Sequence, residues 1–228
     1  MDFQQALTFM FKDEDWIKKV LLGVLISLIP IFGQLALVGY MLAIIQNVKN
    51  DEPRPLPDWS EVIQYFVEGL KSWVVSLVYS LPVIVLSCPL MLIGFVPLFA
   101  GSNEELMGIL AGVSGVAALL LSLPAMLYGL LLGLLSPVLL IRLAETGEIS
   151  DCLRVREVVR FTFANISLII IALLVMIAVA IVVVTPAMFL TLGLLGYPAA
   201  VWTNLAFGHL CGQIARQADW TAAAGRAR

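Results

Sequence analysis

The sequence predicts an all-α fold: a polytopic transmembrane helical bundle of about five proline-kinked spans, with amphipathic interfacial helices. Hydrophobic residues make up 61% of the 228 residues and charged residues only 13%, whereas soluble domains are about half apolar and about a quarter charged. The charges are clustered and leave four uncharged stretches, at 20–45, 72–103, 106–141 and 161–215. Each exceeds the roughly 20 residues that a helix needs to cross a bilayer. We therefore expect residues 1–228 to form a single integral membrane domain.

The first predicted elements are a surface helix and a broken span. Phe3, Leu7, Met10 and Phe11 recur on one helical face, which favours an interfacial helix over residues 1–19 that lies on the membrane. Pro30 and Gly33 interrupt the following span, about 20–45. Because proline removes a backbone hydrogen bond and clashes with the preceding turn, we expect a kink near Ile29 or a re-entrant hairpin.

The middle of the chain predicts a loop, a second surface helix and two long spans. Residues 46–57 contain three prolines and form a loop. Asp58 and Glu61 have the spacing of a capping box, so a short amphipathic helix is expected to start there and to lie along the surface. Two spans follow, at about 72–99 and 106–141, and the five prolines within them favour broken or tilted helices.

The last part of the chain predicts a third surface helix within the polar segment 142–160, then spans at about 163–192 and 197–215. The Ala/Gly/Arg tail is expected to fray. A shift of 96 residues places Ile45-Gln46 over Ile141-Arg142 and Tyr65 over Phe161. This match suggests a parallel repeat of residues 10–100 and 106–196, although low-complexity apolar sequence produces such matches by chance.

The distribution of Lys and Arg predicts the orientation in the cell membrane. Five single crossings place ten of these residues on one side, around loops 46–60 and 142–160 and after the last span. By the positive-inside rule that side, with the C-terminus, is cytoplasmic. Lys12, Lys18 and Lys19 would then lie outside. A hairpin at Pro30–Gly33 would remove this conflict, so the side of the N-terminus stays open.

One string in the chain is distinctive. It consists of Gly39-Tyr40, a polar loop, Leu56-Pro57-Asp58-Trp59, Phe66 and Gly69-Leu70-Lys71. The string resembles the uncharacterised prokaryotic membrane family known as domain of unknown function 4013, closely over residues 3–100 and mainly in hydropathy beyond. The resemblance implies no catalytic residue, because the family has no established activity.

The residues Leu56, Pro57, Asp58 and Trp59 also predict a structure by themselves. Pro57 fixes the backbone before the helix, Asp58 is placed to cap it, and Trp59 is suited to the headgroup level of the bilayer. A partner-docking or gating elbow is one interpretation of this motif. A stable surface helix is the simpler one, and we favour it.

Enzymatic chemistry is not expected, because no Asp, Glu, Lys or Arg occurs within the predicted spans. The zinc-protease and phosphate-loop motifs and paired aspartates are all missing, and no flanking motif supports a serine dyad with the single histidine, His209. Cys88, Cys152 and Cys211 lack the spacing of a metal or redox motif. We therefore expect no catalytic residue, metal site or cofactor, and no binding of nucleic acid, since no basic stripe exists.

A polar stripe in the last span is the remaining candidate site. His209 and Gln213 lie one helical turn apart, Asn204 lies a further turn away, and Gln34 is the polar residue of the first span. Ionisable residues in a membrane favour a functional hypothesis, here a small hydrated cavity. Helix-packing hydrogen bonds are the alternative, and we favour them.

The sequence thus leaves two functional hypotheses. The leading one is a non-enzymatic membrane protein, a scaffold or an accessory subunit, whose partners are the lipid bilayer and either further copies of the chain or another membrane protein. Three GxxxG pairs, at 108/112, 129/133 and 208/212, support close helix packing. The alternative is a small transporter or channel for neutral or weakly charged solutes, supported by the proline-broken spans and the repeat.

Overall fold

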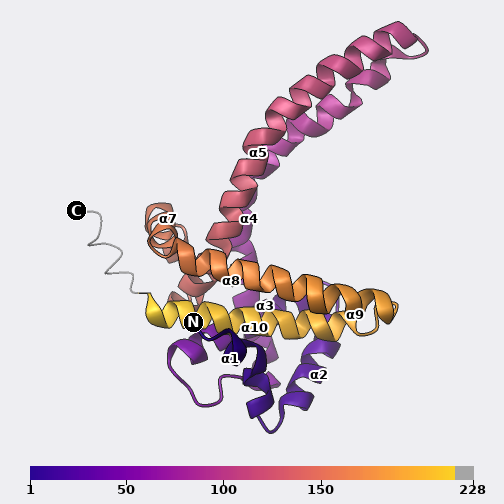
Figure 1. Ribbon diagram of the computed structural model, residues 1–228. Helices are drawn as coiled ribbons and strands as arrows, with labels where there is room; N and C mark the ends of the chain where they lie inside the picture. The colour runs from indigo at the N-terminus through magenta and orange to yellow at the C-terminus, as the bar shows by residue number, and fades with distance from the viewer. Residues whose placement is uncertain (219–228) are drawn as a thin grey trace. The chain divides into compact units, whose positions relative to one another are not determined.

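The computed structural model describes residues 1–218 and is all-helical over them (Figure 1). The chain forms two compact units: unit 1 comprises residues 1–75 and the chain from 134 onward, and unit 2 comprises Ser76–Gly133. The tail that was expected to fray, with Arg226 and Arg228, lies outside the described residues.

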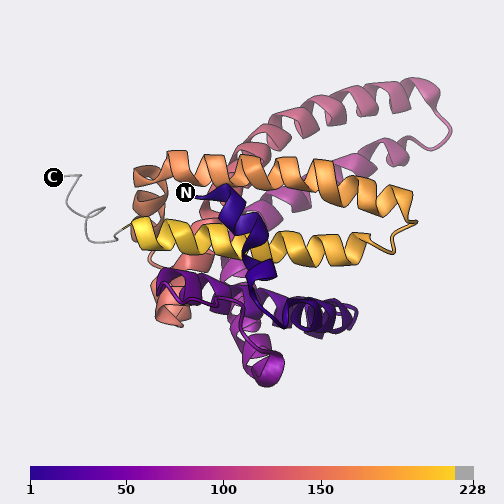
Figure 2. The same cartoon turned by 60° about the horizontal axis from the view of Figure 1, so that its bottom comes forward.

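Unit 1 holds most of the helices, and Figure 2 shows them from a second direction. In chain order the elements before unit 2 are α1 (Phe3–Thr8), the 3-10 turn η1 (Phe9–Lys12), α2 (Trp16–Ser27), α3 (Phe32–Lys49), the 3-10 turn η2 (Trp59–Glu61) and the start of α4 (Val62–Phe95). After unit 2 come the end of α5 (Glu104–Thr146), α6 (Ile149–Cys152), α7 (Val155–Ala164), α8 (Ile166–Val179), the π-turn η4 (Ala180–Val184), α9 (Thr185–Leu190) and α10 (Gly196–Gln217).

Residues 20–45 do not form one kinked helix, because α2 and α3 form a hairpin. The helix stops at Ser27 and resumes at Phe32, and the turn between them contains Pro30 and Ile31, whose φ is 64°. The Gln34 side-chain amide donates to the Ser27 carbonyl across this turn (3.0 Å). The hairpin brings the start of α2 beside the loop after α3, since the Trp59 indole donates to the Lys19 carbonyl (2.8 Å).

The surface helix expected from Asp58 is not a separate element. The turn η2 leads directly into α4, which continues as one helix from Val62 to Phe95. No helix breaker other than Gly69 lies between residues 58 and 72, and Gly69 packs against the backbone of Leu35. The buried side of this segment holds Tyr65 and Ser72, whereas the apolar residues Ile63 and Val67 are exposed.

The polar segment before α8 does form separate helices. In α7, Val158 and Phe161 are buried, and Arg156 and Glu157 are exposed. The helix ends at Ala164, and α8 begins two residues later. The π-turn η4 then leads into α9, with Pro186 in the first turn of that helix.

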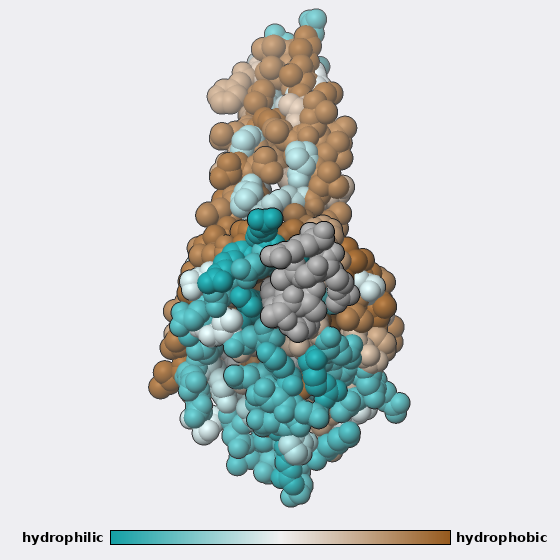
Figure 3. Space-filling view, turned by 90° about the vertical axis from the view of Figure 1, so that its left-hand side faces the viewer, coloured by the Kyte–Doolittle hydropathy of each residue, from teal (hydrophilic) through white to brown (hydrophobic). Residues whose placement is uncertain are grey.

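Unit 2 consists of the later part of α4, the 3-10 turn η3 (Val96–Ala100) and the first part of α5. The helices α4 and α5 continue through Pro82, Pro89 and Pro124, so the expected breaks are absent from these positions of the described chain. Most large apolar side chains here are exposed, and Figure 3 shows hydrophobic side chains over the visible surface of the pair.

Three helices among the described residues are long and apolar enough to cross a membrane: Trp59–Ala100, Glu104–Thr146 and Ile166–Leu190. This finding is compatible with a membrane protein. The helix α10 is also long, but its sequence is less apolar than these three.

The centre of unit 1 is α3, which packs against α10 and the start of α4. Gly208 and Gly212 of α10 contact Met41 and Val48 of α3. On the other side of α3, a Cβ atom at Gly39 would overlap the carbonyl oxygen of Tyr65, and one at Gly69 would overlap that of Leu35. The helices α3 and α4 therefore pack backbone against backbone through one glycine from each.

Candidate functional site

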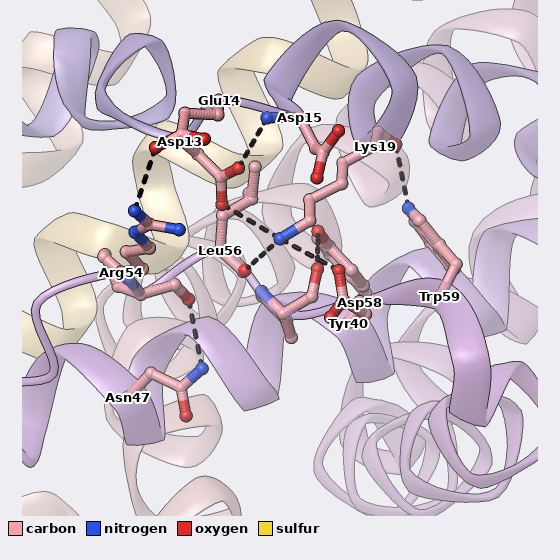
Figure 4. A network of polar contacts seen from close by, with 12 residues as sticks. Asp13, Glu14, Asp15, Lys19, Tyr40, Asn47, Arg54, Leu56, Asp58 and Trp59 are labelled. Atoms are coloured by element: carbon pink, nitrogen blue, oxygen red, sulfur yellow. Dashed lines mark hydrogen bonds and ion pairs between the residues drawn. The ribbon is translucent and has the colours of Figure 1, made fainter.

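The candidate site is a polar network that we call the clasp. It consists of Asp13, Lys19, Tyr40, Leu56, Pro57, Asp58, Trp59 and Tyr65. Figure 4 labels Asp13, Lys19, Tyr40, Leu56, Asp58 and Trp59 of this network. These residues come from the segment before α2, from α2 and α3, from the loop after α3, and from the start of α4. The motif at 56–59, in the loop and η2, therefore joins four other segments of unit 1: the residues before α2, α2, α3 and the start of α4.

Lys19 is the centre of the clasp. Its ammonium contacts the Asp13 carboxylate (2.9 Å), the Asp58 carboxylate (3.0 Å) and the Leu56 carbonyl oxygen (3.0 Å). The side chain of Lys19 is only 12% exposed and that of Asp13 only 7%. All three donor hydrogens of the ammonium thus have an acceptor, which a buried charge requires.

Three aromatic rings form the apolar half of the clasp. The rings of Tyr40 and Trp59 stack, with centroids 4.1 Å apart and planes 5° apart, and Tyr65 contacts both rings edge-on. The Tyr40 hydroxyl donates to the Pro57 carbonyl (2.7 Å), and the Tyr65 hydroxyl donates to the Asp58 carbonyl (2.8 Å). The motif backbone is therefore held by hydroxyl groups from two different helices.

The charged pair favours its ionised form. Burial by itself would raise the pKa of Asp13, but hydrogen bonds from the Lys19 ammonium and the Asp15 N–H, with the charges of Lys19 and Arg54, lower it below the ordinary value. Burial would likewise lower the pKa of Lys19, yet the hydrogen bonds and charges of Asp13 and Asp58 raise it. The pair thus stabilises the fold between the acidic pH at which Asp13 is protonated and the alkaline pH at which Lys19 loses its proton.

One of the roles expected for the motif differs in the structure. Asp58 occupies the cap position before η2, but its side chain makes no capping hydrogen bond and pairs with Lys19 instead. Trp59 is half-buried against Tyr40, and its indole N–H donates a hydrogen bond to the Lys19 carbonyl. Both side chains contact Lys19, because the α2–α3 hairpin places Lys19 beside the loop.

The structure brings together two of the four polar residues predicted in the spans. His209 Nδ1 lies 3.2 Å from Gln213 Nε2, and both side chains are buried. The Gln213 side chain also accepts a hydrogen bond from the Asp2 N–H (2.7 Å) and donates to the Asp2 carbonyl (2.9 Å). The His209 ring contacts Phe9, with centroids 4.5 Å apart. This pair therefore fixes the first residues of the chain on α10.

The other two predicted residues lie elsewhere. Gln34 bonds the Ser27 carbonyl at the hairpin turn, and Asn204, which is exposed, donates to the Ala200 carbonyl of its own helix (2.9 Å). The four residues thus do not line a common cavity in the described part of the chain. A cleft of about 70 Å³ is lined by His209 and Gln213, together with charged residues that include Asp51 and Arg216.

A larger cavity, of about 250 Å³, lies between α3, the start of α4 and the end of α5. Its polar lining includes Gln46, Gln64, Glu68 and Glu145. The two carboxylates are paired with lysines, Glu68 with Lys71 and Glu145 with Lys49, at 2.8 Å each. Among residues 1–218, no group of three or more His, Cys, Asp or Glu side chains is arranged to hold a metal ion.

The sequence missed Lys19, Asp13 and Tyr40 as site residues. Lys19 and Asp13 counted only as charges at the end of a surface helix, because Lys19 finds two of its partners about 40 residues away in the loop, and Asp13 is part of the site through Lys19. Tyr40 does carry a signal, since Gly39-Tyr40 belongs to the string that resembles the family. A buried hydroxyl on an apolar helix needs an acceptor, and the exposed carbonyls of a proline-rich loop provide one.

Comparison with known proteins places the string in a family. No curated protein and no solved structure matches the chain. The family model described as "Protein of unknown function (DUF4013)" matches residues 22–192. This match starts within α2 and extends well past residue 100, so it includes most of the clasp and the second polar segment. Since it covers more than half of the sequence, the chain belongs to the DUF4013 family.

Proposed function

We propose that this protein is a non-enzymatic integral membrane protein that serves as a scaffold or an accessory subunit. The supporting observation is that the polar side chains of its apolar helices form hydrogen bonds with backbone groups of the same chain. Gln213 bonds Asp2, Gln34 bonds Ser27, and Asn204 bonds Ala200. These groups hold helices and turns in place, which is the usual task of polar residues in helical bundles.

The glycine pairs of unit 2 also favour a scaffold. A Cβ atom at Gly108, Gly112, Gly129 or Gly133 would meet no atom within 4 Å, whereas Gly208 and Gly212 are already packed against α3. Helices approach one another closely at such positions in membranes. We propose that the open pairs contact a helix of another copy of the chain or of a membrane partner.

A small transporter or channel is the second candidate. The observation that favours it is the cavity of about 250 Å³ beside α3, whose polar lining lies next to the small residues Gly39 and Ala43. Because Glu68 and Glu145 are each neutralised by a lysine, this site would suit a neutral or weakly charged solute.

A flux assay separates the two proposals. For protein reconstituted in lipid vesicles, we expect glycerol permeability to equal that of protein-free vesicles, because a scaffold has no solute path. The variant His209→Leu is expected to leave the permeability unchanged and to reduce the stability by about 1 kcal/mol or less. His209→Gln, which keeps a hydrogen-bonding side chain, is the matched control and is expected to be tolerated. Glycerol permeability above that of protein-free vesicles would make the scaffold proposal wrong, because the cavity beside α3 would then be a solute path.

We further propose a topology in the cell membrane with the residues before α2 on the cytoplasmic side. Ion pairs connect this segment and the start of α2 to the loop after α3, between Glu14 and Arg54 (3.1 Å) and between Lys19 and Asp58 (3.0 Å). The helix α2 has only 12 residues, about 18 Å, and cannot cross a bilayer about 30 Å thick. A re-entrant α2–α3 hairpin and crossings by α4, α5, α8–α9 and α10 replace the five single spans, and loops 46–60 and 142–160 stay cytoplasmic.

Cysteine labelling tests this topology. In a chain whose three natural cysteines are replaced, we expect Glu14→Cys, Asn50→Cys and Glu148→Cys to react with an impermeant maleimide only after the cells are permeabilised. Ser102→Cys, in the polar turn between η3 and α5, is expected to react in intact cells. Labelling of residue 14 alone from outside would contradict the re-entrant hairpin, and outside labelling of residues 50 and 148 would reverse the orientation.

A further inference from the structure

A cavity of about 350 Å³ lies beside the clasp, where the first turns of α2 meet η2. Asp15, Lys18 and Leu22 line it, and their spacing of three and four residues places them on one face of the chain entering α2. Trp59 and Ser60 of η2 line the opposite side, together with Asp58. Figure 4 shows Asp15, Asp58 and Trp59 arranged around Lys19.

The cavity contains charges of both signs that the fold leaves available. Among residues 1–218, neither the Lys18 ammonium nor the Asp15 carboxylate forms an ion pair. The Asp58 carboxylate pairs with Lys19 through one oxygen, yet its side chain is 75% exposed. The cavity therefore presents a free cation next to two accessible carboxylates, and Lys19 balances one of these carboxylates.

An apolar surface continues from the cavity along α2. Leu22 and Trp59 belong to the cavity wall, and Ile17, Leu21 and Leu25, spaced four residues apart, are exposed on α2. In a membrane such a stripe faces the lipid chains, whereas the charges at the start of α2 face the headgroups. A ligand bound here would have its polar part in the cavity and an apolar part along the helix.

We propose that this cavity binds a phospholipid whose headgroup carries both a phosphate and a primary amine. The lipid ammonium donates hydrogen bonds to the Asp15 and Asp58 carboxylates, and the phosphate accepts from the Lys18 ammonium and the Ser60 hydroxyl. Ammonium donors and phosphate acceptors both form charge-assisted hydrogen bonds, which are stronger than neutral ones. A choline headgroup has no N–H to donate, and a glycerol headgroup has no cation. With either headgroup, only the phosphate finds its hydrogen-bond partners in the cavity, and the two carboxylates receive no hydrogen bond from an ammonium.

Lipid retention by the full chain tests the proposal. The protein is purified in detergent, mixed with equal amounts of phosphatidylethanolamine, phosphatidylcholine and phosphatidylglycerol of the same acyl chains, and analysed for bound lipid by mass spectrometry. We expect phosphatidylethanolamine to be retained about fivefold over each of the others, as the loss of one charge-assisted hydrogen bond implies. Lys18→Gln and Asp15→Asn are each expected to remove most of this preference without changing thermal unfolding in detergent.

The matched control is Lys12→Gln, which removes a lysine near α2 that does not line this cavity. It is expected to keep the preference. Equal retention of the three lipids, or an unchanged preference in Lys18→Gln, would overturn the proposal. Soluble glycerophosphoethanolamine that competes as strongly as the lipid would identify a headgroup site without an acyl chain and would also overturn it. These outcomes do not depend on the scaffold proposal, because they measure lipid retention and not flux or partner binding.

Discussion

Gly39→Ala is expected to destabilise the protein by about 2–3 kcal/mol, because the added methyl group would overlap the Tyr65 carbonyl oxygen. The overlapped atom belongs to the backbone of α4, so no rotation of a side chain relieves the clash. Gly69→Ala is expected to have a similar effect, since its Cβ would overlap the backbone of Leu35. Thermal unfolding in detergent, followed by tryptophan fluorescence, measures the effect.

Gly115→Ala is the matched control for the two glycine variants, because Gly115 belongs to none of the glycine pairs proposed to contact a partner helix. It makes the same substitution within a helix, at a position where the methyl group would meet no atom within 4 Å. Alanine favours a helix over glycine by about 1 kcal/mol, so this variant is expected to be as stable as the wild type or slightly more stable. If Gly39→Ala unfolded at the same temperature as Gly115→Ala, α3 and α4 would not be packed backbone against backbone.

Lys19→Met is expected to cost about 3 kcal/mol, because it leaves the buried Asp13 carboxylate without its cation. The methionine side chain keeps most of the apolar stem, so the change removes mainly the charge. Lys12→Met is the control, since Lys12 is exposed and has no ion pair within residues 1–218. Unfolding by heat or by a denaturing detergent, with equal conditions for both variants, gives the difference.

The pH dependence of the stability lost in Lys19→Met shows whether the loss comes from the missing charge or from the missing packing. The pKa of Asp13 is lowered in the folded protein, so the pair contributes fully above the unfolded pKa of about 3.9 and is lost as the pH falls through the folded pKa. The cost of Lys19→Met is therefore expected to shrink in acid, where a neutral Asp13 needs no cation. A cost that stays constant down to the lowest pH would assign the effect to lost packing of the lysine stem.

The sequence predicted the class of fold well because charge clustering and hydropathy are local properties. The all-helical fold, the long apolar helices and the family all follow from such patterns. The path of the chain at Pro30 was harder to predict, since a proline and a glycine fit both a kink and a full reversal. The reversal is favoured by contacts with distant segments, including the bond from Trp59 to Lys19, and local sequence does not encode these partners.

The candidate site was predictable to a different extent at each residue. The motif at 56–59 stood out by its composition, and all four of its residues take part in the clasp. The partner of Asp58 was missed, because capping requires only neighbours in sequence whereas the pairing with Lys19 requires the hairpin. His209 and Gln213 lie one turn apart and met as expected, but Gln34 and Asn204 found backbone acceptors nearby.

The hydrogen bonds between Asp2 and Gln213 also set an order of events during synthesis. These two residues are 211 positions apart, and at about 5–20 residues per second a ribosome needs roughly 10–40 s to travel between them. The helix α1 packs against α10, so the buried side chain of Ala6 lacks this partner helix until α10 emerges. The helix α1 is therefore among the last to dock, and the nascent chain exposes its apolar side to the membrane or to chaperones throughout this interval.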